Sequence, residues 1–186
     1  MIKSALQSSL TNDVKYRNLD TFNVPSSEYL IETALVGTGG VASVTFSNLG
    51  QYAGVYQHLF IRAVARTSQA ATSGIVFLDF NGSAGTIGHY LLGDGSSVSS
   101  DDSESRAGFV TGANATSNAF GGLLLEIPDA FETTKNKTAK GFSGPGIGVY
   151  MTSALLASTS AITSLTLRAN GSFVQYSRFS LYGVTV

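Results

Sequence analysis

The stretch Ile162–Val186, ITSLTLRANGSFVQYSRFSLYGVTV, alternates apolar and polar side chains in two successive segments. Strict alternation indicates β-strands, because successive side chains of a strand point to opposite faces of a sheet. In the second segment, Phe179 and Leu181 are predicted to face a core, and Tyr182 is predicted to lie on the opposite face. Asn170–Gly171 is predicted to form the turn between the segments, because both residue types tolerate a positive φ. The stretch therefore predicts two closing strands of a β-sandwich.

The composition favours sheets and excludes several classes of function. Charged residues make up 12% of the 186 residues and 21 residues are glycine, so Ser, Thr, Asn and Gly must supply most of the polar surface, as in strands and turns. A net charge of −1 provides no basic field for a phosphate backbone. The absence of cysteine excludes disulfides and Cys-ligated zinc. No run approaches the roughly 18 apolar residues that span a bilayer. We therefore expect neither nucleic acid nor a membrane as a partner.

Strand signals recur from Ser27 onward at the spacing of an all-β chain. Val55–Arg66 is predicted to be the longest strand, with a small, apolar core face and a second face that mixes aromatics with arginines. Asn81–Gly82 is predicted to be a hairpin turn before the strand Ile87–Leu92. About nine or ten strands, long crossing loops and no convincing helix predict an all-β fold, a two-sheet antiparallel β-sandwich of jelly-roll or Greek-key type.

Residues 1–26 are predicted to be a short N-terminal arm, and residues 27–186 a single β-sandwich domain. Isolated apolar residues stand in the arm: Ile2, Leu6, Leu10, Val14, Tyr16, Leu19 and Phe22. The first three recur every four residues, which fits a short helix that is marginal on its own. A frayed terminus and an arm that orders against a neighbouring subunit both fit this pattern.

The sequence contains no motif for catalysis. The two histidines, His58 and His89, stand in strand patterns, which favours a satisfied or interfacial side chain over a ligand or a base. No G-x-S-x-G elbow accompanies them. The carboxylates available for glycoside hydrolysis are Asp79, Glu126 and Asp129, and nothing in the sequence pairs two of them. We therefore expect no catalytic or cofactor-binding residues and no enzyme.

Two polar segments are predicted to be loops. The segment Gly93–Arg106, GDGSSVSSDDSESR, carries the carboxylates of Asp94–Glu104, which could gather around calcium. Its spacing matches no EF-hand, so a solvated charged loop is the preferred interpretation and no metal site is predicted. The segment Thr133–Lys140, TTKNKTAK, is predicted to be an exposed basic loop, and Gly141–Gly148 a glycine-rich bend.

Three stretches together resemble a family of proteins. They are KYRNL with the following SSEYLIET in Lys15–Thr33, YQHLFIRAVAR at Tyr56–Arg66, and the C-terminal stretch that ends in SRFSLYGV. They resemble the β-sandwich virion proteins of tailed bacteriophages, a group that includes head decoration (cement) proteins, head fibres and some tail-fibre modules. The resemblance extends from about Lys15 to the end of the chain. It rests on packing and turn signatures, so it transfers no catalytic or binding residue.

The resemblance implies a jelly-roll-like subunit, usually a homotrimer, on the outer surface of a phage particle. The first hypothesis is a capsid decoration protein that binds the lattice of the major capsid protein and stabilises the head. The alternative is a receptor- or glycan-binding head-fibre or tail-fibre module. That alternative needs an aromatic platform, for which four tyrosines are available: Tyr52, Tyr56, Tyr90 and Tyr150. A glycan-cleaving enzyme ranks last, because no acidic pair stands out.

Overall fold

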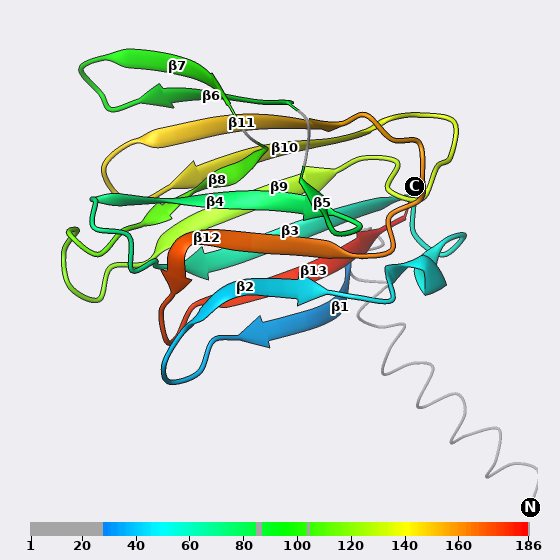
Figure 1. Ribbon diagram of the computed structural model, residues 1–186, viewed down its shortest axis with the longest axis horizontal. Helices are drawn as coiled ribbons and strands as arrows, with labels where there is room; N and C mark the ends of the chain where they lie inside the picture. The colour runs from blue at the N-terminus through cyan, green and yellow to red at the C-terminus, as the bar shows by residue number, and fades with distance from the viewer. Residues whose placement is uncertain (1–27, 85–86, 104, 186) are drawn as a thin grey trace, which may run out of the picture.

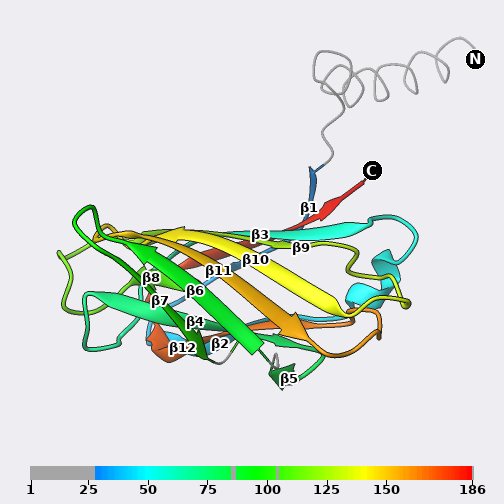
Figure 2. The same ribbon diagram turned by 90° about the horizontal axis from the view of Figure 1, so that it is seen from above.

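The computed structural model describes residues 28–84, 87–103 and 105–185. These residues form two antiparallel sheets that pack face to face, as Figures 1 and 2 show. The one helical element among them is a single 3₁₀ turn, η1 (Leu49–Tyr52). The predicted arm, residues 1–26, and the short helix considered for it lie outside the described residues.

The two sheets differ in width. Sheet A has eight strands, in the spatial order β1 (Glu28–Leu35), β13 (Arg178–Val184), β3 (His58–Ala65), β9 (Gly121–Ile127), β10 (Lys137–Gly144), β11 (Val149–Leu156), β6 (Ile87–Gly93) and β7 (Val98–Ser103). Sheet B contains β2 (Val41–Phe46), β12 (Leu165–Phe173) and β4 (Ser73–Phe80), with β8 (Arg106–Thr111) and β5 (Ser83–Ala84) also paired to β4.

Eight of the strands have jelly-roll connectivity. Along the chain, β1, β2, β3, β4, β8, β9, β12 and β13 change sheet at every step except from β4 to β8, which pair with each other in sheet B. As a result, the order β1-β13-β3-β9 in sheet A faces the order β2-β12-β4-β8 in sheet B, which is the double Greek key of a jelly roll. The strands β6, β7, β10 and β11 are insertions that widen sheet A. The predicted two-sheet sandwich is confirmed, although the described residues contain thirteen strands rather than nine or ten.

The core lies between the sheets and follows the alternation of the sequence. In β3, the small apolar face is buried, whereas Arg62 and Val64 point outward and are exposed. In β13, Phe179 and Leu181 are fully buried, as predicted, and Tyr182 lies on the opposite face. The ring of Phe179 meets that of Phe173 edge-on, with 4.7 Å between the centroids.

The predicted turn at Asn170–Gly171 is wrong. Both residues belong to β12, and the pairing of this strand with β2 shifts register between Arg168 and Phe173. The neighbouring backbone hydrogen-bonds with Ser68, so the positive φ of Gly171 (92°) serves an irregularity inside the strand. The chain turns after Phe173, where the N–H of Ser177 donates to the Val174 carbonyl at 3.1 Å, and β12 and β13 lie in opposite sheets.

Two of the predicted loops contain strands. Residues Val98–Ser103 form β7, the edge strand of sheet A, so Gly93–Arg106 is not one long loop. The Ser and Asp residues of this segment give no strand signal, because an edge strand exposed on both faces needs no apolar alternation. The exposed-loop prediction for Thr133–Lys140 is also wrong from Lys137 onward, where β10 begins with a buried lysine. The glycine-rich bend starts after Gly144 for the same reason.

The Asn81–Gly82 turn is confirmed, with φ values of 50° and 78°. It joins β4 to β5, a partner strand of only two residues. The strand predicted to follow, β6, lies in sheet A instead. The turn chemistry therefore predicts the local geometry correctly, but not the sheet to which the next strand belongs.

Candidate functional site

The outer face of sheet A carries a row of exposed apolar side chains. Four residues on adjacent strands lie directly opposite one another, and we call them the apolar row: Leu124 in β9, Phe142 in β10, Met151 in β11 and Leu91 in β6. Each side chain is between 43% and 57% exposed. Neighbouring strands in register place these side chains side by side on one face. A contiguous exposed apolar strip of this kind is typical of an interaction surface.

At the β9–β10 end of the apolar row the face is hollowed into a depression of about 720 Å³. Gly122 and Gly144 lie opposite each other in adjacent strands beside Leu124 and Phe142. A Cβ added at Gly122 would meet no atom within 4 Å, so the pair of glycines leaves open space between larger neighbours. The lining extends from β10 across β9, β3 and β13 to Leu30 of β1.

The far rim of the depression is held by a charged and aromatic cluster. The Arg62 guanidinium donates to the Glu28 carboxylate at 2.5 Å and thereby ties the first residue of β1 to β3. The same guanidinium lies about 5 Å from the ring centroids of Phe60 and Tyr182. Figure 2 shows the start of β1 and the end of β13 rising on the side of sheet A that faces away from sheet B.

A polar row runs beside the apolar row on the same face. Lys140 lies opposite Glu126 and pairs with it at 3.0 Å, and Ser153 lies opposite His89. The side chain of His89 is exposed there, next to Leu91 in the chain direction. His89 is therefore an exposed side chain on the same face as the apolar row, and the interfacial role that its strand pattern favours stays a prediction.

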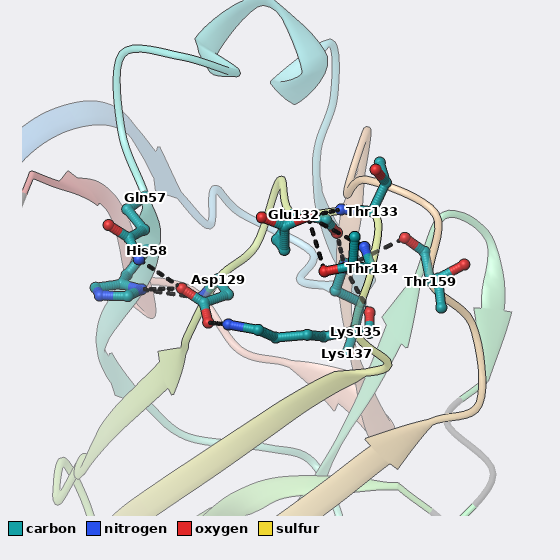
Figure 3. Close-up of polar contacts among 9 residues, drawn as sticks. All are labelled: Gln57, His58, Asp129, Glu132, Thr133, Thr134, Lys135, Lys137 and Thr159. Carbon is teal, nitrogen blue, oxygen red and sulfur yellow. Dashed lines mark hydrogen bonds and ion pairs between the residues drawn. The ribbon is translucent and has the colours of Figure 1, made fainter.

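A second concavity, of about 540 Å³, lies where the connection before β3 meets the connection after β9. Asp129 stands at its centre with a positive φ of 45° (Figure 3). Its backbone N–H donates to Nδ1 of His58 at 2.8 Å, and its carboxylate accepts from Gln57 and from Lys135, each at 2.7 Å. The hydrogen bond from Lys135, followed by that from Gln57, lowers the pKa of Asp129 below its usual value. We call this concavity the polar pocket.

His58 has a structural role in the polar pocket. Its Nδ1 accepts the N–H of Asp129 and therefore carries no proton in this arrangement. The nearer carboxylate oxygen of Asp129 is 3.7 Å away, beyond hydrogen-bond distance. His58 is the satisfied side chain that its strand pattern favours, and it holds the left-handed backbone of Asp129.

A buried lysine organises the loop that borders the polar pocket. Lys137 is 1% exposed, and its Nζ donates to the carbonyls of Glu132, Lys135 (2.9 Å) and Thr159 (3.4 Å). Burial lowers the pKa of Lys137, against a smaller opposing effect of the nearby Glu132 and Asp129 carboxylates. Figure 3 shows Lys137 beneath the loop. Its Nζ supplies the hydrogen-bond donor that backbone N–H groups would otherwise provide to these carbonyls.

Arg66 likewise donates hydrogen bonds to backbone carbonyls, here in the loop between β8 and β9. Its two terminal nitrogens donate to four backbone carbonyls at 2.7–3.1 Å: those of Ala113, Ala115, Thr116 and Ala119. Arg66 and Lys137 therefore act as loop scaffolds. Sequence reasoning missed both, because a basic residue near a strand end normally indicates a solvated position.

The carboxylates considered for catalysis do not come together. Asp79 lies in sheet B and is bound by Arg168 at 2.5 and 3.0 Å. Glu126 lies on the outer face of sheet A with its own lysine, and Asp129 lies in the polar pocket. The three carboxylates lie on three different surfaces, and each pairs with a different basic side chain: Arg168, Lys140 or Lys135.

The four tyrosines do not form one platform. Tyr52 and Tyr56 contact each other at 5.8 Å between centroids, and Tyr29 stacks on Tyr56 at 6.0 Å. Tyr90 and Tyr150 form a second group around Phe109, in which Tyr150 is buried. Within the polar pocket, Tyr56 is accompanied by Phe131 instead.

The described carboxylates of Asp94–Glu104 do not share one site. Asp94 caps the turn between β6 and β7, where its carboxylate accepts four hydrogen bonds of 2.7–2.9 Å from Ser96 and Ser97, which lower its pKa well below the usual range. Asp101 and Asp102 are neighbours in β7 and point to opposite faces, and Glu104 lies outside the described residues. Within residues 28–84, 87–103 and 105–185, no three His, Cys, Asp or Glu side chains gather as metal ligands would.

No protein-family model matches the chain, and no curated protein matches its sequence. A helix long and apolar enough to cross a membrane is not found among the described residues. Two surfaces of the molecule are candidates for binding: the outer face of sheet A and the polar pocket.

Proposed function

We propose that the chain is a structural virion protein, a capsid decoration protein that binds the lattice of the major capsid protein on the outside of a phage head. The apolar row on the outer face of sheet A is the observation that carries this proposal. The jelly-roll connectivity and the sequence resemblance to phage virion proteins support it. The scattered, individually paired carboxylates favour a protein that acts through its surface over one that acts through catalysis.

The stabilising effect in this proposal comes from mass action. A subunit that binds the assembled lattice and not the free capsid protein shifts the equilibrium toward the lattice. The apolar row supplies buried area, at about 25 cal/mol per Å² removed from water. The neighbouring Glu126–Lys140 pair supplies a polar border that fixes the orientation. Assembly as a homotrimer completes the proposal, because three linked copies gain avidity without any new contact.

Copy number in the virion tests this function. Quantitative gel densitometry of purified particles should show the protein in a fixed, high ratio to the major capsid protein, and cryo-electron microscopy should place it on the head surface. A few copies per particle, or density confined to the tail, would contradict the decoration role.

The binding surface is tested separately with particles that lack the protein. Replacing Leu91 and Met151 by serine should weaken binding of the recombinant protein to such particles by at least about tenfold, since two apolar contacts at about 1 kcal/mol each are lost. Val41→Ser is the control, because Val41 is 40% exposed on sheet B. Equal binding of the double variant and the control would exclude this face as the contact.

The polar pocket favours a second candidate, a receptor- or glycan-binding module. Tyr56 and Phe131 border a recess in which Gln57 and Asp129 are held in fixed positions. Aromatic faces beside amide and carboxylate groups are the usual surroundings of a bound sugar. Binding to arrays of host-surface glycans, lost in Phe131→Ala and kept in Leu91→Ser, would establish this role. No binding on such arrays or to host cells would exclude it.

A further inference from the structure

The depression in sheet A is lined mainly by apolar groups, with Arg62 and Arg178 among its polar residues. Leu30 on its β1 side is 60% exposed, and Val64 and Phe142 on the other side are about half exposed. Water in such a hollow gains few polar partners, because the lining offers mainly alkyl and aromatic groups.

The chain that precedes β1 joins this strand at the rim of the depression. Leu30 and Thr33, both in β1, line it, and 27 residues of the sequence precede Glu28. The bond between Glu28 and Arg62 holds the first residue of β1 over β3, on the outer side of sheet A. Figure 2 shows this start of β1 standing clear of the sheet on that side. A segment attached there reaches the depression without crossing any other part of the molecule.

The preceding sequence has the length and the composition to fill it. From β1 to β10 there are four strand spacings, about 19 Å, which an extended chain covers with about six residues. Val14–Phe22 provides nine residues, with apolar side chains at Val14, Tyr16, Leu19 and Phe22. Between it and β1, the sequence Asn-Val-Pro-Ser-Ser at residues 23–27 is typical of a change in chain direction.

We propose that residues Val14–Phe22 lie across this depression in their own subunit. Attachment through five residues gives the segment a local concentration in the millimolar range, which favours the same subunit over a second copy. Leu91 and Met151, at the other end of the apolar row, are absent from the lining of the depression and stay free for a partner. The proposal concerns the free subunit and does not rest on the decoration function.

Cysteine cross-linking in the full-length chain tests the placement, because the natural sequence contains no cysteine. One cysteine replaces Asn18 in the segment, and a second replaces Val64 in the depression. The matched control pairs Asn18→Cys with Thr45→Cys, since Thr45 is exposed on β2 in sheet B. A short bismaleimide is added to dilute protein, and products are separated under denaturing conditions.

We expect an intramolecular product from the Val64 pair that is independent of protein concentration and about tenfold more abundant than from the Thr45 pair. Adding Tyr16→Ser and Phe22→Ser should reduce that yield toward the control. Equal yields from both pairs would overturn the proposal. A predominant cross-linked dimer would overturn it too, because it would place the segment of a second copy in the depression. None of these outcomes depends on capsid binding, which the particle experiments measure separately.

Discussion

Truncation of Phe179 to alanine tests whether the C-terminal strand closes the core. Phe179 has no exposed surface, and its ring meets Phe173 edge-on at 4.7 Å. A Phe→Ala change at a fully buried site costs about 3–5 kcal/mol, from the lost transfer free energy and the cavity left behind. That loss is a large part of the roughly 5–15 kcal/mol by which a domain of this kind is stable. We therefore expect Phe179→Ala to unfold at a much lower urea concentration than the natural protein.

Urea denaturation measures the effect, at a fixed protein concentration because self-association would make the apparent stability depend on it. Met151→Ala is the control, since Met151 is 57% exposed on the outer face of sheet A and lies outside the lining of the depression. Its cost should stay below about 1 kcal/mol. A double-mutant cycle of the milder changes Phe179→Leu and Phe173→Leu should give a coupling of about 0.5–1.5 kcal/mol. Equal losses in Phe179→Ala and Met151→Ala would refute the assignment of the two faces.

Three further predictions concern the loops and the packing. Lys137→Met should lower the free energy of unfolding by about 3 kcal/mol, because three loop carbonyls lose their donor. Lys140→Met removes an exposed ion pair and should lower the free energy of unfolding by less than about 1 kcal/mol. Equal urea midpoints for the two variants would contradict this prediction. Gly183→Ala should cost about 1–3 kcal/mol and change the near-ultraviolet circular dichroism, because its Cβ would lie 2.1–2.5 Å from the ring of Tyr56; an unchanged spectrum and midpoint would show that the ring yields freely. Hydrogen bonds from the turn lower the pKa of Asp94 in the folded state, so its contribution to stability is present above the unfolded value of about 3.8 and is lost as the pH falls below it. A carboxyl-carbon titration by nuclear magnetic resonance should place this pKa well below that value, and a midpoint at or above it would contradict the hydrogen-bonded turn.

The sequence predicts which face of a strand is buried better than it predicts which strands are neighbours. The alternation in β3 and β13 assigned Phe179, Leu181 and the small face of β3 to the core correctly. Alternation depends only on the next few residues, so it can be read locally. It failed for β7, because a strand exposed on both faces has no apolar period to detect.

Turn chemistry is similarly local. Asn81–Gly82 and Asn170–Gly171 are the same dipeptide, yet only the first is a hairpin turn. At the second, hydrogen bonds between Ser172 and Ser68, more than 100 residues apart in the chain, keep the strand going. A positive φ is what the dipeptide predicts, and Gly171 has one. Long-range pairing decides whether that φ makes a turn or an irregularity in a strand.

The candidate surfaces depend on pairing register in the same way. Gly122 and Gly144 create the depression only because β9 and β10 place them opposite each other. Asp129 and His58 meet only because the connections before β3 and after β9 converge. Neither relation has a signal in a single sequence, since the partners are more than 20 residues apart in both cases.

The inserted strands supply most of the apolar row on the outer face of sheet A. Their inner side has a clear structural role against β8: the Phe109 N–H donates to Ser143 Oγ at 2.9 Å, and Thr152 Oγ1 donates to the Ala107 carbonyl at 2.8 Å. Those contacts cover the edge of β8 that does not pair with β4. The pleat separates the two faces, so polar side chains on the outer face would leave these contacts intact. Three of the four residues in the apolar row nevertheless come from the insertions. The fold does not require these apolar side chains, and this supports the proposal that the outer face of sheet A binds a partner.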